Sequence, residues 1–381
     1  MTRKRTIFEE VGQAESGKAL PAGGMIDRAP GARGAVRGWL MVLFALVVVM
    51  IAVGGLTRLT DSGLSSTEWR PVTGALPPMS EAAWAAEFDK YRQIPQYQLV
   101  NQGMSLAEFK VIYWWEWGHR QLGRLIGLVW ALGFAWFWLR GRIPPGWTGR
   151  LLGLGALGGL QGAIGWWMVA SGLREGMVAV ASYRLAVHLG LAFVILGLIA
   201  WYVFLLGRRE TDLMQARRAQ ERRLVGLSTG LMHFAFLQIL LGALVAGIDA
   251  GRTYTDWPLM HGVFFPPESF DLAPLWRNFF ENPALVQFMH RMAGYLLLAL
   301  AFVAWLRGRR SAHGATRMAF HLVMGLMLWQ AVLGVLTVLY GAPWQLAIAH
   351  QFTAVLLWVA IIRARHLGRY PRARSLREGR A

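Results

Sequence analysis

The stretch "GWLMVLFALVVVMIAVGGLTRLT", residues 38–60, decides the class of fold because it begins with a long apolar run. A bilayer core about 30 Å thick needs roughly 20 apolar residues in a helix. Hydrophobic residues make up 55% of the 381 residues. Charged residues make up only 16%, below the roughly 25% of an ordinary soluble domain. The sequence therefore predicts a polytopic membrane protein.

Seven further stretches have the length and apolarity of membrane helices. We expect an all-α fold with eight transmembrane helices, at 38–57, 119–139, 149–171, 183–206, 224–248, 288–306, 318–340 and 345–363. The polar remainder sets the domain boundaries. They are a disordered cytoplasmic tail at 1–37, a first four-helix half at 38–207, a basic linker at 208–223, a second half at 224–363 and a basic tail at 364–381.

The net charge of +18 is distributed unevenly between the two membrane faces that eight spans define. One face holds 27 basic and 8 acidic residues (+19), and the other holds 12 basic and 13 acidic residues (−1). Loops rich in Lys and Arg stay in the cytoplasm. We therefore expect both termini to be cytoplasmic, and the charge needs no nucleic-acid partner.

The chain contains an internal repeat. The stretch from Gly38 aligns with that from Gly230 at an offset of 192, and "TEWRPVTGALPP" (67–78) resembles "TDWPLMHGVFFPP" (255–267). Three further pairs follow: "EWGHRQLGR" (116–124) with "QFMHRMAGY" (287–295), "LQGAIG" (160–165) with "WQAVLG" (329–334), and "LAVHLGLA" (185–192) with "AIAHQFTA" (347–354). Four spans return the chain to its starting side. We therefore predict two tandem four-helix bundles related by a pseudo-two-fold axis along the membrane normal.

The repeat selects four of the nine histidines, matching His119 with His290 and His188 with His350. Each half therefore presents two imidazoles near the outer ends of alternate helices. The chain has no cysteine, which excludes thiolate ligands and disulfides. Two imidazoles from two helices are the arrangement that ligates a haem iron axially, whereas zinc would need further ligands. A single histidine at this depth could equally be a hydrogen-bonding residue.

A small residue follows each matched histidine by four positions and so shares its helix face. These residues are Gly123, Ala192, Gly294 and Ala354. A flat porphyrin edge could lie on such a bare patch, although small residues are also common where membrane helices pack.

The two halves differ in one charged position. Glu116 precedes His119 by three residues, whereas Gln287 precedes His290. We predict a catalytic carboxylate in the first half, with a helix-terminal carboxylate as the alternative. Arginines at the same level could pair with haem propionates or could extend to the membrane interface; they are Arg120, Arg124, Arg184 and Arg291.

At these residues the chain resembles the haem A synthase family, which converts haem O to haem A for cytochrome oxidases. The resemblance covers about 38–366, and its most specific pieces are "TDSGLSSTEWRPVTGALPP", "EWGHRQLGR", "HRMAGY" and "IAHQFTA". It implies an iron cofactor, haem b, held by His290 and His350. It also implies a haem O substrate site at His119 and His188, with Glu116 as the catalytic glutamate.

The implied reaction oxidises a porphyrin methyl group to formyl by two hydroxylations and loss of water. Some members of the family carry a cysteine pair in the first outer loop, and this chain departs from them. The resemblance further implies contact with haem O synthase and with cytochrome oxidase assembly factors.

Two other functions stay open on sequence alone. A dihaem b-type cytochrome exchanging electrons with quinone would need the same histidines, and a tandem-repeat transporter would place its polar site nearer the midplane. We expect a bacterial inner (plasma) membrane rather than a mitochondrial one, because the short polar amino-terminal tail, with Glu9, Glu10 and Glu15, is a poor transit peptide. The pattern leaves a homo-oligomer open.

Overall fold

The computed structural model describes residues 30–372, which form twelve α-helices and, within that range, no β-strand. Eight helices are long and apolar enough to cross a membrane, so the predicted all-α fold with eight spans is confirmed. They are α1 (Pro30–Leu59), α4 (Leu106–Leu139), α5 (Thr148–Gly172), α6 (Ser182–Leu206), α8 (Arg222–Gly247), α10 (Pro283–Gly308), α11 (Gly314–Leu339) and α12 (Trp344–Arg369).

Two of these helices begin well before the predicted spans. Helix α1 starts at Pro30 rather than at 38, so 30–37 is helical, and the remainder of the predicted tail lies outside the described residues. Helix α4 starts at Leu106 rather than at 119 because Ser105 and Glu108 form a capping box there. Glu116 and His119 therefore lie inside a helix and not at its beginning.

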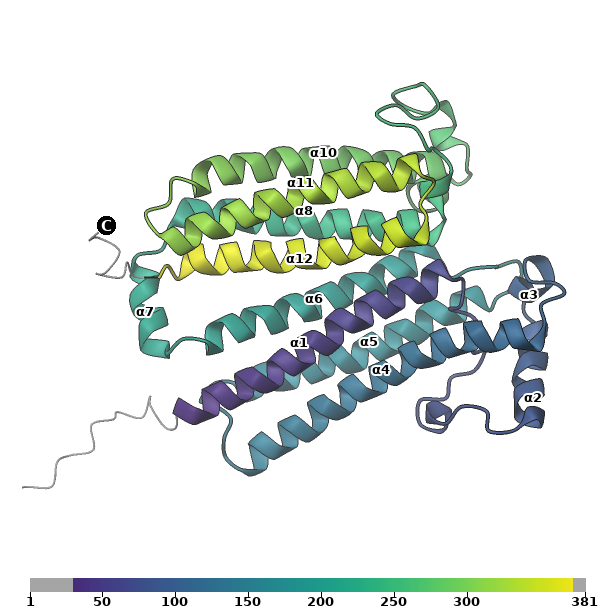
Figure 1. The fold of residues 1–381 in the computed structure, drawn as a ribbon, viewed down its shortest axis with the longest axis horizontal. Coiled ribbons are helices and arrows are strands. Elements are labelled where there is room, and N and C mark those ends of the chain that lie inside the picture. Colours follow the sequence, from purple (N-terminus) through teal and green to yellow (C-terminus); the bar gives the residue numbers. More distant parts are fainter. Residues whose placement is uncertain (1–29, 373–381) are drawn as a thin grey trace, which may run out of the picture.

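The four spans of the first half form a ring. Helix α1 packs on α4 and α6, and α5 packs on the same two helices. Helices α4 and α6 therefore lie opposite each other in the bundle (Figure 1).

The second half repeats this arrangement. Helix α8 packs on α10 and α12, and α11 packs on the same two, so α10 and α12 are opposite each other. In both halves the opposite helices are the ones that carry the matched histidines. This agreement supports the tandem repeat, while the symmetry axis itself remains a prediction.

Helix α6 joins the halves. It packs on α8 and α12 as well as on α1 and α5, and the indole of Trp358 donates a hydrogen bond of 3.0 Å to the carbonyl of Phe193. Gly197 allows the close approach, because a Cβ there would lie 3.0 Å from the same indole. The apolar core is continuous through this contact.

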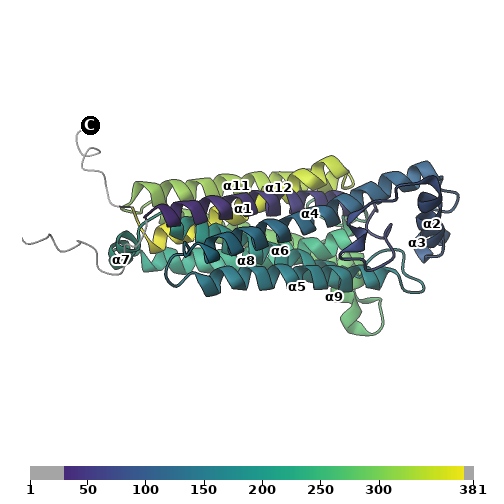
Figure 2. The same ribbon diagram turned by 90° about the horizontal axis from the view of Figure 1, so that it is seen from below.

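Short helices lie at both ends of the bundle. The long loop 60–105 contains α2 (Glu81–Arg92) and α3 (Pro95–Leu99), and the long loop 248–282 contains α9 (Asn278–Glu281). We name them the first and second outer loops after the predicted topology. The predicted linker 208–223 contains α7 (Glu210–Arg218), at the same end as both described ends of the chain (Figures 1 and 2). The predicted carboxyl-terminal tail is helical as far as Arg369, and 373–381 lies outside the described residues.

Candidate functional site

The first pair of predicted haem-binding residues comes from opposite helices of the first bundle. His119 is on α4 and His188 is on α6, and the two imidazoles are close enough to interact electrostatically. Because α4 and α6 lie across the bundle from each other, the two side chains approach through its interior. This geometry suits a planar group held between two helices.

The second pair has the same placement. His290 on α10 and His350 on α12 also interact electrostatically across their bundle. The structure therefore brings the four histidines together as two pairs, in the combinations that the sequence predicts. Their role as ligands remains a prediction.

Each imidazole lies against a glycine of a neighbouring helix. A Cβ at Gly165, Gly242 or Gly334 would lie 2.9, 3.1 or 3.2 Å from the Cε1 atom of His188, His290 or His350, respectively. For His119 the facing residue is Gly54, and the nearest ring atom is Nε2, at 3.1 Å. A larger residue at any of these glycines would displace an imidazole.

Three of the four imidazoles also contact a glutamine. The side-chain amide of Gln161 lies 3.3 Å from Nδ1 of His188, and that of Gln238 lies 3.1 Å from Nδ1 of His290. Each amide also donates a 3.0 Å hydrogen bond to the backbone carbonyl of its histidine.

Gln330 is the third of these glutamines, and its amide lies 3.2 Å from Nε2 of His350. The Oε1 atoms of Gln161, Gln238 and Gln330 are buried and have no hydrogen-bond partner in the described part of the chain. The three glutamines therefore keep unused acceptor capacity beside the histidines.

Glu116 is 3% exposed, and both oxygens of its carboxylate accept hydrogen bonds. One oxygen accepts hydrogen bonds from the Ser65 hydroxyl (2.7 Å) and the Ser66 backbone N–H (2.8 Å). The other accepts a 2.5 Å hydrogen bond from the guanidinium of Arg120, one helical turn later. These donors hold a carboxylate one turn from His119 on the helix that carries it.

The matched position in the second half is neutral. Gln287 is also buried, and its amide donates a 3.1 Å hydrogen bond to the carbonyl of Tyr254 in the second outer loop. Both residues therefore tie their helix to an outer loop, but only the first half has a buried negative charge at this position.

The four predicted propionate partners donate hydrogen bonds to backbone carbonyls. Arg120 bonds to Ser66 at 3.0 Å, and Arg184 bonds to Trp167 at 2.7 Å. Arg124 bonds to the carbonyls of residues 70 and 71, and Arg291 to those of 254 and 259, all at 2.9 Å. Arg120, Arg124 and Arg291 thus hold the outer loops, whereas Arg184 joins α6 to α5. The contact of all four with propionates remains a prediction.

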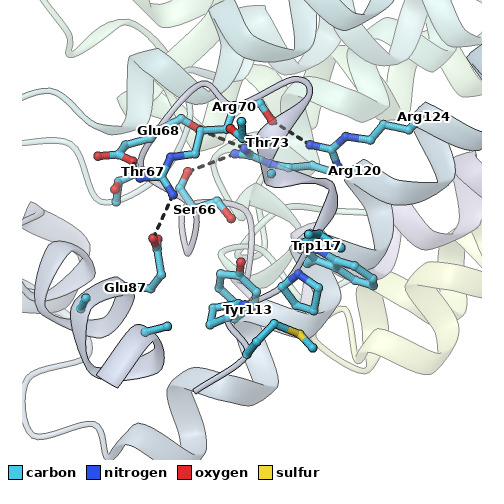
Figure 3. Close-up of a pocket in the computed structure, with 17 residues that line it drawn as sticks. Ser66, Thr67, Glu68, Arg70, Thr73, Glu87, Tyr113, Trp117, Arg120 and Arg124 are labelled. Atoms are coloured by element: carbon cyan, nitrogen blue, oxygen red, sulfur yellow. Dashed lines mark hydrogen bonds and ion pairs between the residues drawn. The ribbon is translucent and has the colours of Figure 1, made fainter. Parts of the chain in front are cut away.

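A cavity of about 350 Å³ is lined in part by Arg120, whose guanidinium binds Glu116 (Figure 3). The first outer loop, α2 and α4 line it, with Tyr113, Trp117 and Arg120 on the α4 side. Lys90 donates a 3.2 Å hydrogen bond to Glu68 at this cavity and holds the pKa of that carboxyl below its usual value. Arg120 therefore contacts both this cavity and Glu116.

The structure corrects the register of the repeat in the first helix of each half. Met50 lies against Gly123 as Gln238 lies against Gly294, with Cβ contacts of 3.5 and 3.3 Å. Gly54 likewise takes the place of Gly242. The equivalent residues are therefore 188 apart rather than 192, and the difference between these offsets is about one helical turn.

The sequence prediction did not identify the groups that surround the histidines and Glu116. Gln161 and Gln330 were recognised as matched, but not as contacts of His188 and His350. The signal was the spacing "QGAIG", "QILLG" and "QAVLG", with a glycine four residues after each glutamine. Ser65 and Ser66 belong to the motif "TDSGLSSTEWRPVTGALPP", but the sequence did not indicate their contact with Glu116, because only the fold of the outer loop brings them there.

Residues 37–362 match a family described as cytochrome oxidase assembly protein. The heme A synthase of Ruegeria sp. (strain TM1040) is 69% identical over 376 residues, covering 98% of this chain and 99% of that protein. That of Ruegeria pomeroyi is 67% identical over 381 residues, covering 99% and 100%. That of Paracoccus denitrificans is 62% identical over 375 residues, covering 98% of each.

Proposed function

Because the chain belongs to the cytochrome oxidase assembly protein family, we propose that it is a multi-pass membrane enzyme of haem A biosynthesis that oxidises haem O to haem A. The family membership predicted from the sequence is confirmed by this match. The proposal also covers three details: the residues that carry the reaction, the haem b cofactor and the orientation in the membrane.

The residues present fit two haem groups. Within the described residues no group of three or more His, Asp or Glu side chains could hold a bare metal ion, so each imidazole pair suits an iron that a macrocycle already holds. The facing glycines leave the imidazole edges uncrowded. The buried Nδ1 atom of His350 and the three glutamine Oε1 atoms have no partner among the described groups.

The two halves take different roles in this proposal. His119 and His188 hold the substrate haem O, and His290 and His350 hold haem b. When bound, haem b supplies a one-electron carrier beside the site of oxidation.

One observation carries the assignment of the reacting half: a buried carboxylate, Glu116, lies one turn from His119, where the second half has the neutral Gln287. A negative charge at low dielectric stabilises positive charge that develops during oxidation of a porphyrin methyl, and it can accept a proton. Ser65, Ser66 and Arg120 fix the position of this carboxylate.

The test is the Glu116→Gln variant, analysed by extracting and identifying its haems. We expect conversion of haem O to fall by about 100-fold or more, as is typical for loss of an electrostatic or proton-transfer group, while haem b content stays normal. Glu108→Gln is the matched control, because it removes a carboxylate from the same helix and glutamine preserves the capping box. Full conversion by Glu116→Gln would overturn the role of Glu116.

The same extraction tests the function itself. An enzyme of this kind contains haem O or haem A beside haem b, whereas a dihaem electron carrier contains haem b alone. If the purified protein contained haem b as its sole haem, the proposed function would be overturned.

The proposal extends to the cellular setting. Delivery of haem O by haem O synthase and transfer of haem A to cytochrome oxidase assembly factors suit a membrane enzyme of this family. The excess of basic residues at the end that carries both described chain ends supports an inner-membrane orientation with cytoplasmic termini.

A further inference from the structure

The repeat makes the environment of His119 different from that of the other three histidines. Helices α5, α8 and α11 each carry a glutamine followed four residues later by the glycine that faces an imidazole. Helix α1 carries Met50 and Gly54 at the same spacing. His119 is therefore the one matched histidine that has no glutamine opposite it in the structure.

The difference is visible in how the imidazoles are held. His188 and His290 meet an amide at 3.3 and 3.1 Å from Nδ1, and each of these amides is fixed by a second hydrogen bond to the backbone. The Met50 thioether offers a ring nitrogen neither the N–H donor nor the strong oxygen acceptor of a glutamine side chain. His119 also presents the opposite ring edge, Nε2 and Cδ2, to its facing glycine.

Groups that contact a metal-binding imidazole fix its orientation, and their loss typically weakens binding by about 10–100-fold. Building on the proposed function, we infer that Met50 leaves His119 without the amide that contacts the other three imidazoles. The first half therefore releases its haem, while the second half retains haem b. This fits the different needs of a substrate, which must leave, and a resident cofactor.

A reciprocal exchange tests the inference, because Met50 and Gln238 occupy equivalent positions. We expect Met50→Gln to slow the release of haem from the first half to apomyoglobin by about tenfold or more. We expect Gln238→Met to speed the loss of haem b by a similar factor. The electron paramagnetic resonance spectrum, which reports the orientation of axial imidazoles, should change in the altered half alone.

Two controls separate the amide from packing. Met50→Leu keeps the size of the side chain and adds no amide, so its release rate should match that of the unaltered protein. Met41→Gln adds an amide to an exposed position of the same helix and should also change nothing. Equal release rates for Met50→Gln and Met50→Leu, with unchanged spectra, would overturn the inference. The identity of the released haem tests the proposed function separately, since haem b from the first half would contradict that function alone.

A second, independent observation lies at the opposite end of the molecule. A cavity of about 310 Å³ is lined by four arginines and one glutamate, between the start of α8 and the end of α10; they are Arg222, Arg223, Arg307, Arg310 and Glu221. None of the four guanidinium groups has a hydrogen-bond or ion-pair partner within the described residues. Glu221 instead accepts a 2.7 Å hydrogen bond from the Ser311 hydroxyl.

The start of α8 adds a second feature that favours an anion. No side chain caps the first turn of α8, so the amide groups there point outward with the positive end of the helix dipole. The arginines stand where two membrane-spanning helices end, which is the level of lipid headgroups. Basic pockets between transmembrane helices bind anionic lipids. We propose that this arginine pocket binds the phosphate of an anionic phospholipid.

The test compares phosphatidylglycerol and phosphatidylcholine nanodiscs, and detergent with added inorganic phosphate. Native mass spectrometry should find phosphatidylglycerol retained, and replacing the four pocket arginines by glutamine should reduce that retention at least about tenfold. The control replaces four arginines at the same end but outside the pocket, Arg142, Arg150, Arg217 and Arg218. Equal retention by both variants would overturn the proposal, and stabilisation by inorganic phosphate alone would assign the pocket to a soluble anion.

Discussion

At the scale of single residues, Glu116 and Gln287 differ in charge but share a place in the repeat. Each is buried in the outer half of its helix and bound to the outer loop next to it. In both halves the residue at this position therefore joins its helix to an outer loop, and only the first half also has a negative charge there. We therefore expect the Glu116→Gln variant to keep the fold while it removes the charge.

The glycines that face the imidazoles give a second prediction at this scale. We expect Gly165→Ala to weaken haem binding in the first half about tenfold, because its Cβ would lie 2.9 Å from His188 Cε1 and overpacking costs about 1–3 kcal/mol. Gly162→Ala, on the same helix with open space around its Cβ, is the control. Haem titration of the purified proteins measures both, and equal affinities would show that His188 can shift without loss.

The four histidines could be predicted from the sequence because the repeat marks them twice. Their glutamine and glycine partners could not, although the spacing of "QGAIG" and "QILLG" was visible. Which face of one helix meets which face of the next depends on the rotation of both helices. A register error of one turn in the first helix was enough to hide the equivalence of Met50 and Gln238.

At the scale of elements, α4 shows where apolar periodicity misleads. Its first two turns contain Glu108 and Lys110, so a search for apolar residues begins the helix at 119. The helix in fact starts at Leu106, and its outer part packs on the first outer loop through Phe109 and Tyr91. The spans were therefore predictable from hydropathy, while the extension that supports the cavity was not.

The second outer loop provides a pH-dependent prediction. Partial burial acts to raise the pKa of Asp256, but hydrogen bonds from the backbone N–H groups of His261 (2.9 Å) and Gly262 (3.1 Å) hold it below the ordinary value of 3.8. An acid with a lowered pKa stabilises the folded loop above its ordinary pKa and loses that contribution as pH falls through the folded value. The turn at 256–262 should therefore be ordered at neutral pH and loosen below about pH 3.8.

Hydrogen exchange measures this loosening directly. At pH 7, Asp256→Ala should speed exchange of the His261 and Gly262 amides by about tenfold, the scale expected for hydrogen bonds to a charged group. Asp271→Ala, elsewhere in the same loop, should leave them unchanged. If acid loosened the turn equally in the Asp256→Ala variant, the cause would lie in another group.

At the scale of the whole molecule, the absence of cysteine makes the orientation easy to test. We expect a membrane-impermeant maleimide to label Gln98→Cys on α3 in intact cells, and to label Gln215→Cys on α7 only after the membrane is opened. Both positions are exposed in the structure, and the unaltered chain supplies a blank. The reverse pattern would place the excess of basic residues outside and contradict the predicted topology.

The repeat could not predict which helices join the two halves. Similarity between halves indicates two bundles, but it does not say which helix faces the other bundle. The structure assigns that role to α6, which packs on α8 and α12 with small residues, Gly190 and Gly197, at the contact, and to α1, where the amide of Gln351 on α12 donates a 2.7 Å hydrogen bond to the carbonyl of Ile51. The two halves are thus joined by direct packing of their helices and not only by the linker.

The hydrogen bonds around Glu116 also have a kinetic consequence. Residues 65 and 66 belong to the first outer loop and supply two of the donors that fix the carboxylate, and Arg120 bonds to both the loop and Glu116. The loop therefore cannot lift without releasing the carboxylate. If Glu116 acts as proposed, its carboxylate is in position for chemistry only while residues 65 and 66 stay in place.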